Sequence, residues 1–308
     1  MHVPVLFEET LDYLITNPQG VYIDCTVGGG GHFQGIIERT NNRAILIGID
    51  QDANALERTR ARLGTSDNII LVKGNFRNLQ IILRRLSIRD ADGILIDLGV
   101  SSFQLDEEER GFSYHLEARL DMRMDPELDT SAWDLVNKWP VDKLQQIIGE
   151  YGEERYAGRI ARGIANARQY GPLNSTLDLV EVIRKSVPAS YRRETHPARR
   201  TFQALRIEVN QEIESLRQVL PQAAAFLKPG GRLCIISFHS LEDRIVKEYF
   251  ARESKDCLCP GRQPVCTCGH KAQFKVLTRK PVGASPGEIA RNNRARSAKL
   301  RVAQKLEF

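Results

Sequence analysis

The sequence contains no hydrophobic run close to the roughly 18 residues that a membrane-spanning helix needs. Its first stretch, MHVPVLFEETLDYL, also lacks a basic leader, because it carries two Glu and one Asp. Fibrous and low-complexity segments are absent, and 42% hydrophobic with 27% charged residues is close to the globular average. We therefore expect a soluble, intracellular protein, built as one large domain or as a core with an insertion.

The glycine run in YIDCTVGGGGHF, residues 22–33, lacks both common patterns for binding nucleotide phosphates. The dinucleotide fingerprint G-x-G-x-x-G requires a third glycine, but counting from Gly28 reaches Phe33, and counting from Gly29 reaches Gln34. A P-loop would continue with Gly-Lys-Ser/Thr, which does not follow here. The sequence thus argues against an NAD-dependent oxidoreductase and against a phosphate-cradling loop.

The sequence does contain short apolar runs that alternate with helical stretches. Five runs have the composition of buried parallel strands: VYIDCTV from Val21, AILIGID from Ala44, NIILVKGNF from Asn68, DGILIDLGVSS from Asp92 and GGRLCIISFHS from Gly230. This alternation predicts an α/β fold, a Rossmann-like doubly wound sheet with ligands at the carboxyl ends of its strands. Cys25 and Cys234 lie within these runs, where a thiol behaves as a small hydrophobe.

The long interval between the fourth and fifth strands has a helical pattern throughout. Only its last part, from about Arg206 to Leu227, is needed as the crossover helix of the sheet. We therefore predict a core of residues 1–104 and 206–308 with an inserted all-helical domain at 105–205. After the fifth strand, FKVLTRKPV and SAKLRVAQKL predict a terminal hairpin that completes the sheet.

Polar and aromatic residues follow the predicted strands in chain order. Asp24 ends the first strand, Asp50 ends the second, Asn75 and Phe76 follow the third, and Asp97 ends the fourth. An acid at the tip of the second strand typically accepts hydrogen bonds from both ribose hydroxyls. Without a phosphate cradle, such a site favours a phosphate-free nucleoside, and S-adenosylmethionine is the common ligand of this kind. Taken singly, each residue has an ordinary alternative role as a helix cap or as core packing.

Longer motifs resemble the bacterial small-subunit rRNA methyltransferases of the RsmH or MraW family, which methylate the exocyclic amino group of one cytidine in 16S rRNA. The resemblance runs from end to end of the chain: HVPVL (2–6), DCTVGGGGH (24–32), GID (48–50), DLGVSSFQLD (97–106), GFSY (111–114), LDMRMD (120–125), SFHSLEDR (237–244) and NNRARSAKLR (292–301).

This resemblance implies a class I S-adenosylmethionine-dependent methyltransferase that modifies the N4 amino group of a cytidine. It implies that the partner is 16S rRNA in the assembled small ribosomal subunit, that the helical insertion recognises rRNA, and that the enzyme is cytoplasmic and forms homodimers. The cofactor contacts implied by the matching motifs are Gly30, Gly31, His32, Asp50, Phe76, Asp97 and Gln104. The family often has Pro where this chain has Phe103, so the backbone path before Gln104 differs.

The fourth strand ends in DLGVSS and lacks the Asp/Asn/Ser-Pro-Pro-aromatic tetrad of DNA amino-methyltransferases. Asp97 and the following carbonyls, with Ser101 or Ser102, are candidates for the same location, and His239 is a second catalytic candidate. Aromatic candidates for stacking on the base are Phe103, Phe112 and Tyr114, with core packing as their alternative. A non-enzymatic rRNA-binding factor is the remaining alternative, and the presence of Asp50, Asp97 and Gln104 argues against it.

Basic residues gather in two segments. Residues 271–308 hold ten Lys and Arg against two Glu, and residues 191–206 hold five Arg and one Glu. A locally basic surface indicates a polyanionic partner, and Arg294, Arg296 and Arg301 are the RNA-contact candidates in the tail.

A separate cluster, CLCPGRQPVCTCGH at 257–270, contains Cys257, Cys259, Cys266 and Cys268. Four thiols in two C-x-C pairs can hold a zinc ion tetrahedrally, although C-x-x-C is the commoner zinc spacing. Reduced free thiols and redox-labile disulfides are the alternatives, and the sequence leaves all three open.

Overall fold

The structure is a computed structural model. It describes residues 4–64, 66–100, 107–194, 196–260, 263 and 265–307, apart from the side chains of Glu108 and Glu194. The roles predicted for Ser101, Ser102, Phe103 and Gln104 therefore fall outside the described residues. The chain divides into two compact units, Met1–Gly99 with Ile213–Phe308 and Val100–Glu212. The boundaries expected from the sequence, after residues 104 and 205, lie five and seven residues from these.

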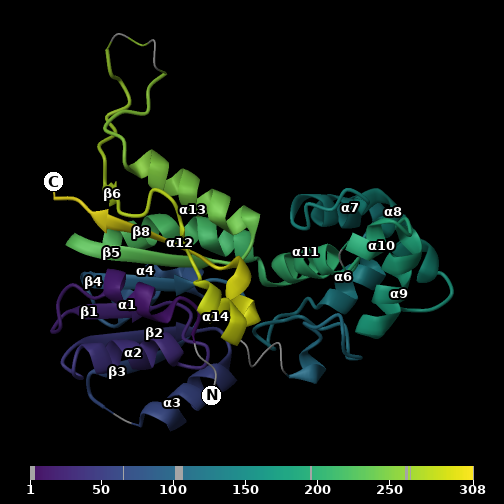
Figure 1. Ribbon diagram of the computed structural model, residues 1–308, viewed down its shortest axis with the longest axis horizontal. Helices are drawn as coiled ribbons and strands as arrows, with labels where there is room; N and C mark the ends of the chain where they lie inside the picture. Colours follow the sequence, from purple (N-terminus) through teal and green to yellow (C-terminus); the bar gives the residue numbers. More distant parts are fainter. Residues whose placement is uncertain are drawn as a thin grey trace. The chain divides into compact units, whose positions relative to one another are not determined.

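The first unit is built on one eight-stranded sheet in the order β3-β2-β1-β4-β5-β8-β6, with β7 also paired to β8 (Figure 1). Its strands are β1 Val21–Asp24, β2 Ile45–Asp50, β3 Ile69–Lys73, β4 Ala91–Asp97, β5 Leu227–Ser237, β6 Phe274–Val276, β7 Val282–Gly283 and β8 Lys299–Lys305. The strands from β1 to β5 are parallel, and β8 is antiparallel to β5. All five parallel strands predicted from the sequence are confirmed.

The two faces of this sheet bury separate apolar clusters, because alternate side chains of a strand point to opposite faces. On one face, Ile23, Ile94 and Ile235 pack with residues of helices α4 (Leu79–Arg85), α12 (Glu212–Phe226) and α13 (Ser240–Glu253). On the other face, Tyr22, Leu95 and Cys234 pack with α1 (Phe7–Leu14) and α2 (Gly31–Arg39). Cys25 and Cys234 are both buried, as predicted.

The remaining helical segments of this unit are short or lie at its edges, and they are α3 Ala53–Leu63, η1 Phe76–Asn78, α14 Pro286–Arg291 and η3 Asn293–Ser297. The side chain of Asp52 caps α3 by accepting a 3.0 Å hydrogen bond from the backbone of Asn54. Gly64 ends the same helix with a φ of 72°, a conformation that glycine adopts without strain.

The second unit is helical and has its own apolar core. Its elements are η2 Glu108–Arg110, α6 Ala132–Lys138, α7 Val141–Glu150, α8 Ala157–Ala167, α9 Thr176–Ser186, α10 Tyr191–Glu194 and α11 Arg199–Asn210. Ser131 and Asp134 form a capping box at α6, and Ser175 and Asp178 form another at α9. Phe112 is only 7% exposed and belongs to this core, which favours the packing alternative for that residue.

One sequence prediction on the helices is wrong. The crossover helix predicted from about Arg206 to Leu227 is broken, because α11 ends at Asn210 and α12 begins at Glu212, with Gln211 at a φ of 50° between them. Side chains stabilise the break, since Asn210 donates to the Met122 carbonyl at 2.8 Å and Arg206 pairs with Glu212 at 2.9 Å. Local periodicity carries no signal for such partners.

The predicted antiparallel completion of the sheet is present, but it is not a simple hairpin. β8 lies between β5 and β6, and both β6 and β7 pair with β8. In the part of the chain that the structure describes, no helix combines the length and the apolarity that crossing a membrane requires.

Candidate cofactor-binding site

Three carboxylates end three neighbouring parallel strands of the sheet. Asp24 is the last residue of β1, Asp50 of β2 and Asp97 of β4, and β1 lies between the other two strands. Parallel strands bring their carboxyl ends to one edge, which is where doubly wound sheets bind ligands. The structure thus places these three predicted site residues together. Asp24 is almost completely buried, with 2% of its surface exposed.

The glycine run forms a tight turn between β1 and α2. The backbone N–H of Gly30 donates to the Val27 carbonyl at 2.8 Å, and Gly30 has a φ of 73°. A Cβ on Gly31 would lie 2.3 Å from Cγ of Pro4, so only glycine fits there without displacement. The turn is fixed to the second strand because the N–H of Gly28 donates to Oδ2 of Asp50 at 2.7 Å.

Burial makes all three carboxyl groups reluctant to ionise. It raises the pKa of Asp24 to about 7, with a further contribution from the charge of Asp50. It raises the pKa of Asp50 to about 6, although backbone N–H groups of Asp52 and Gly28 oppose the shift. Burial and the charges of Asp24 and Glu242 raise the pKa of Asp97 well above its usual value. Such a group of acids favours a cationic ligand.

Thr26 connects two of these acids and was missed by the sequence reasoning. Its hydroxyl accepts a 2.7 Å hydrogen bond from the backbone N–H of Asp97 and lies 3.4 Å from Oδ1 of Asp24. A hydroxyl two residues after a strand-ending acid was the available signal. The second carboxylate oxygen of Asp97, Oδ1, is buried and has no hydrogen-bond partner among the described residues. A buried carboxylate oxygen without a partner indicates that a bound ligand donates a hydrogen bond to it.

His32, the second residue of α2, lies beside the other carboxylate oxygen of Asp97 and is 5% exposed. Its Nε2 lies 3.1 Å from the carbonyl oxygen of Val5, and its Nδ1 lies 3.5 Å from Oδ2 of Asp97. The ring also stacks on Phe7, with ring centroids 6.0 Å apart. His32 is therefore held at the carboxylate cluster, on the side of the glycine turn.

Phe76 and Asn75 follow β3 at the same edge. Phe76 is partly buried against the apolar cluster of the sheet. Asn75 caps η1 by accepting a 3.0 Å hydrogen bond from the N–H of Arg77, and its Nδ2 donates to Gln51 at 2.9 Å. Contact of these two residues with an adenine ring stays a prediction.

His239 follows β5 and serves as the N-cap of α13. Its Nδ1 accepts a long, 3.5 Å hydrogen bond from the N–H of Glu242, and its Nε2 lies 3.1 Å from Oε1 of the same residue. Nδ1 as acceptor places the ring proton on Nε2, facing the buried carboxylate. This arrangement gives His239 a structural role, while its predicted catalytic role stays untested.

A family model described as the MraW methylase family matches residues 1–306. The chain belongs to this family. The chain is similar to two relatives named Ribosomal RNA small subunit methyltransferase H. It is 52% identical to the one from Carboxydothermus hydrogenoformans and 53% identical to the one from Heliobacterium mobile. The first match covers 100% of this chain and 98% of the relative, and the second covers 99% of each.

A solved structure named as a putative rRNA-methylase from Clostridium thermocellum matches with a TM-score of 0.45 and 12% identity, over 99% of this chain and 100% of that chain. Membership of the MraW methylase family confirms the enzyme class expected from the sequence, an S-adenosylmethionine-dependent methyltransferase of class I fold.

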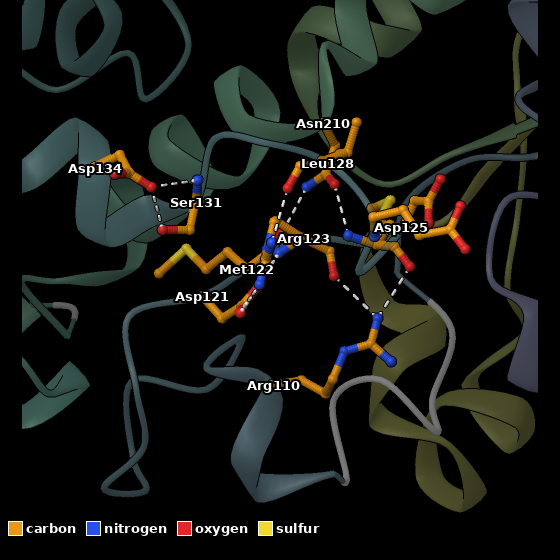
Figure 2. Close-up of polar contacts among 11 residues, drawn as sticks. Arg110, Asp121, Met122, Arg123, Asp125, Leu128, Ser131, Asp134 and Asn210 are labelled. Atoms are coloured by element: carbon orange, nitrogen blue, oxygen red, sulfur yellow. Dashed lines mark hydrogen bonds and ion pairs between the residues drawn. The ribbon is translucent and has the colours of Figure 1, made fainter.

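The family motif LDMRMD, residues 120–125, forms a polar network within the helical unit (Figure 2). Oδ1 of Asn210 accepts a 2.7 Å hydrogen bond from the N–H of Met124, and its Nδ2 donates to the Met122 carbonyl. Nη2 of Arg110 donates to the carbonyls of Arg123 and Met124 at 2.9 and 3.0 Å. The backbone of the motif is thus held by two side chains from outside it, those of Asn210 and Arg110.

Within the same network, Arg123 is bound to two neighbouring segments. Its Nη2 lies 2.7 Å from Oδ2 of Asp121, and its Nη1 donates to the Leu128 carbonyl at 2.7 Å (Figure 2). This pairing holds the pKa of Asp121 below its usual value despite partial burial. Two of the nine acids of residues 105–129 are thus paired within the segment, Asp121 with Arg123 and Glu107 with Arg110 at 3.4 Å.

The structure corrects the prediction for Arg301. This residue lies in β8, is 7% exposed, and places Nε 2.6 Å from Oδ1 of Asp243 on α13. Arg301 therefore stabilises the first unit and is not an exposed RNA contact. Arg294 and Arg296 lie in η3 and are exposed, and their contact with RNA stays a prediction.

Proposed function

We propose that this enzyme transfers a methyl group from S-adenosylmethionine to the exocyclic N4 amino group of a cytidine in 16S rRNA of the small ribosomal subunit. The names of its relatives support the substrate class. The observation that carries the cofactor assignment is the buried Oδ1 of Asp97 beside the glycine turn, within a cluster of three acids.

The residues of this edge fit the cofactor chemically. S-adenosylmethionine, when bound, supplies a methyl group activated on a positively charged sulfur. Asp24, Asp50 and Asp97 form no ion pair with Lys or Arg within the described ranges, so a cationic ligand would relieve their mutual repulsion. We propose that the cofactor is held by Gly30, Gly31, His32, Asp50, Phe76, Asp97 and, outside the described residues, Gln104.

The chain must also make the cytosine amino group nucleophilic, because its lone pair is delocalised into the ring. A group that accepts hydrogen bonds from the amino protons draws that lone pair out. We propose Asp97, with Ser101, for this role, since its carboxylate lies at the ligand-binding edge while the ring of His239 is engaged as a helix cap. Holding the reactants in line contributes about 7–11 kcal/mol in well-aligned systems.

The helical unit and the basic segments provide the proposed rRNA contacts. Arg192 and Arg193 on α10 and Arg294 and Arg296 on η3 are exposed. Phosphate contacts of such residues position the RNA rather than specify its sequence. We propose that the reaction takes place in the cytoplasm, in keeping with an rRNA substrate. The homodimer expected from the resemblance stays a prediction.

The test is incubation of the full chain with methyl-labelled S-adenosylmethionine and, separately, naked 16S rRNA, mature small subunits and DNA. We expect label in 16S rRNA, at N4 of a cytidine after nuclease digestion. Asp97→Asn should abolish transfer, whereas Asp12→Asn, at a side chain that is 64% exposed, should leave it unchanged. Label only in DNA, or in no substrate, would contradict the proposal.

A further inference from the structure

The four cysteines of the loop between α13 and β6 lie together. The Sγ of Cys257 lies 3.4 Å from that of Cys266 and 3.8 Å from that of Cys268. The Sγ of Cys266 lies 4.0 Å from that of Cys259 and 3.6 Å from that of Cys268. All four sulfur atoms lie within 4.8 Å of one another.

These distances fit one metal ion and do not fit disulfides. Zn–S bonds of about 2.3 Å at tetrahedral angles separate the sulfur atoms by about 3.8 Å. A disulfide would bring two of them to about 2.05 Å. An iron–sulfur cluster would spread the four sulfur atoms further apart, because several metal atoms would lie between them.

Backbone N–H groups surround the sulfur atoms as they do in zinc–thiolate sites. The N–H of Leu258 donates to Sγ of Cys268 at 3.3 Å, that of Cys259 to Sγ of Cys257 at 3.4 Å, and that of Thr267 to Sγ of Cys259 at 3.5 Å. Such bonds stabilise thiolates and orient them toward the centre of the cluster.

Within the described part of the loop, the large apolar side chains are exposed and form no core. Leu258 is 41% exposed and Val265 is 70% exposed. The stem is closed where the N–H of Gln273 donates to the Glu253 carbonyl at 2.7 Å, and the cysteines lie beyond it. Figure 1 shows this segment extending from the ends of α13 and β6. Loops longer than about 15 residues are uncommon without a structural or functional reason, and a metal cross-link is one.

We propose that Cys257, Cys259, Cys266 and Cys268 bind one structural zinc ion as four thiolates. Binding transfers the thiol protons to solvent and leaves no open coordination position, so the site folds the loop and performs no catalysis. His270 is not needed as a ligand, because the four thiolates already complete the tetrahedron. Its Nε2 instead lies 3.7 Å from Oε2 of Glu253.

The test is elemental analysis of the full-length protein after loading with zinc chloride and dialysis. We expect about one zinc ion per chain. Cys266→Ser should lose most of this zinc, and Val265→Ser, which places a serine at the neighbouring exposed position, should retain it. Retention of S-adenosylmethionine binding by both variants shows that the sheet is folded.

Two measurements on the unmodified chain do not depend on these variants. Cobalt should give the absorption bands of a tetrahedral four-thiolate site, and a chelator should expose four additional thiols to a thiol reagent. The proposal would be overturned if the protein retained no metal, or if it held stoichiometric iron in place of zinc. It would also be overturned if the thiols reacted equally without chelator, or if titratable thiols were lost through disulfide formation.

Discussion

Nδ1 of His32 lies 3.5 Å from Oδ2 of Asp97, while the opposite ring nitrogen faces the carbonyl oxygen of Val5 at 3.1 Å. Because a carbonyl only accepts, Nε2 carries a proton, and any further proton is shared between Nδ1 and the Asp97 carboxylate. This contact places Oδ2 of Asp97 beside His32, while Oδ1 has no hydrogen-bond partner among the described residues. The start of α2 therefore positions a residue that ends β4.

Cofactor binding should release protons. A cation at the cluster favours the ionised carboxylates, so it lowers the raised pKa values of Asp24 and Asp97. The affinity for S-adenosylmethionine should therefore increase as the pH rises from about 5.5 to about 7.5. S-adenosylhomocysteine, whose sulfur is neutral, should show a smaller increase. Titration calorimetry in two buffers of different ionisation enthalpy measures the released protons, and equal heats in both buffers would contradict this expectation.

Without ligand, the same acids should make stability fall as the pH rises. The pKa of Asp24 is about 7 in the folded chain and 3.8 in the unfolded one, so the folded state binds more protons between these values. Relative to Asp24→Asn, the wild-type chain should lose on the order of 2–4 kcal/mol of unfolding free energy between about pH 4 and pH 7. Urea unfolding across this range measures the difference. Asp67→Asn, at an exposed position, should follow the wild type.

The glycine turn should tolerate no side chain at Gly30. Gly30 and Gly64 have nearly the same φ, 73° and 72°, but a Cβ on Gly30 would lie 3.0 Å from Oγ1 of Thr59, whereas nothing lies within 4 Å at Gly64. Alanine at Gly30 should cost about 1–2 kcal/mol of stability from the left-handed backbone conformation, and alanine at Gly64, where ψ is −164°, should cost more because essentially only glycine adopts that conformation. Only Gly30→Ala should also weaken S-adenosylmethionine binding. Equal affinities of the two variants would show that the turn does not contact the cofactor.

The sequence was sufficient to predict where the acids of the site lie. Short apolar runs set the parallel strands, and the residues that end β1, β2 and β4 must then share one edge of the sheet. The same logic predicted Asp24, Asp50 and Asp97 as neighbours without any structural information.

The contacts that tertiary packing decides were beyond the sequence. The pairing of Arg301 with Asp243 joins β8 to α13, and no local pattern distinguishes this arginine from the exposed arginines of η3. The break at Gln211 depends on Asn210 bonding to the backbone of Met122, 88 residues away. In both cases a distant partner overrides the local pattern.

Asn210 should be essential for the stability of the helical unit. Its amide satisfies the buried backbone at both Met122 and Met124, and truncation leaves these polar groups without a partner (Figure 2). We expect Asn210→Ala to cost about 2–4 kcal/mol. Asn166→Ala, at an exposed position of α8, should cost less than about 0.5 kcal/mol. Thermal unfolding compares the two variants, and similar midpoints would show that the network contributes little.

Alanine variants of Arg296 and Arg301 should have different effects, although both residues belong to the basic tail. One should weaken RNA binding and the other should destabilise the fold. Among the described residues, Arg301→Ala leaves Asp243 with Lys299, at 3.2 Å, as its cationic partner and should destabilise the fold by about 3 kcal/mol. Arg296→Ala removes an exposed charge and should leave the unfolding free energy unchanged. It should weaken binding to 16S rRNA most at low salt, because an exposed phosphate contact depends on counterion release. Unfolding curves and RNA binding at two salt concentrations measure both effects. Unchanged RNA binding by Arg296→Ala at both concentrations would exclude this arginine from the interface.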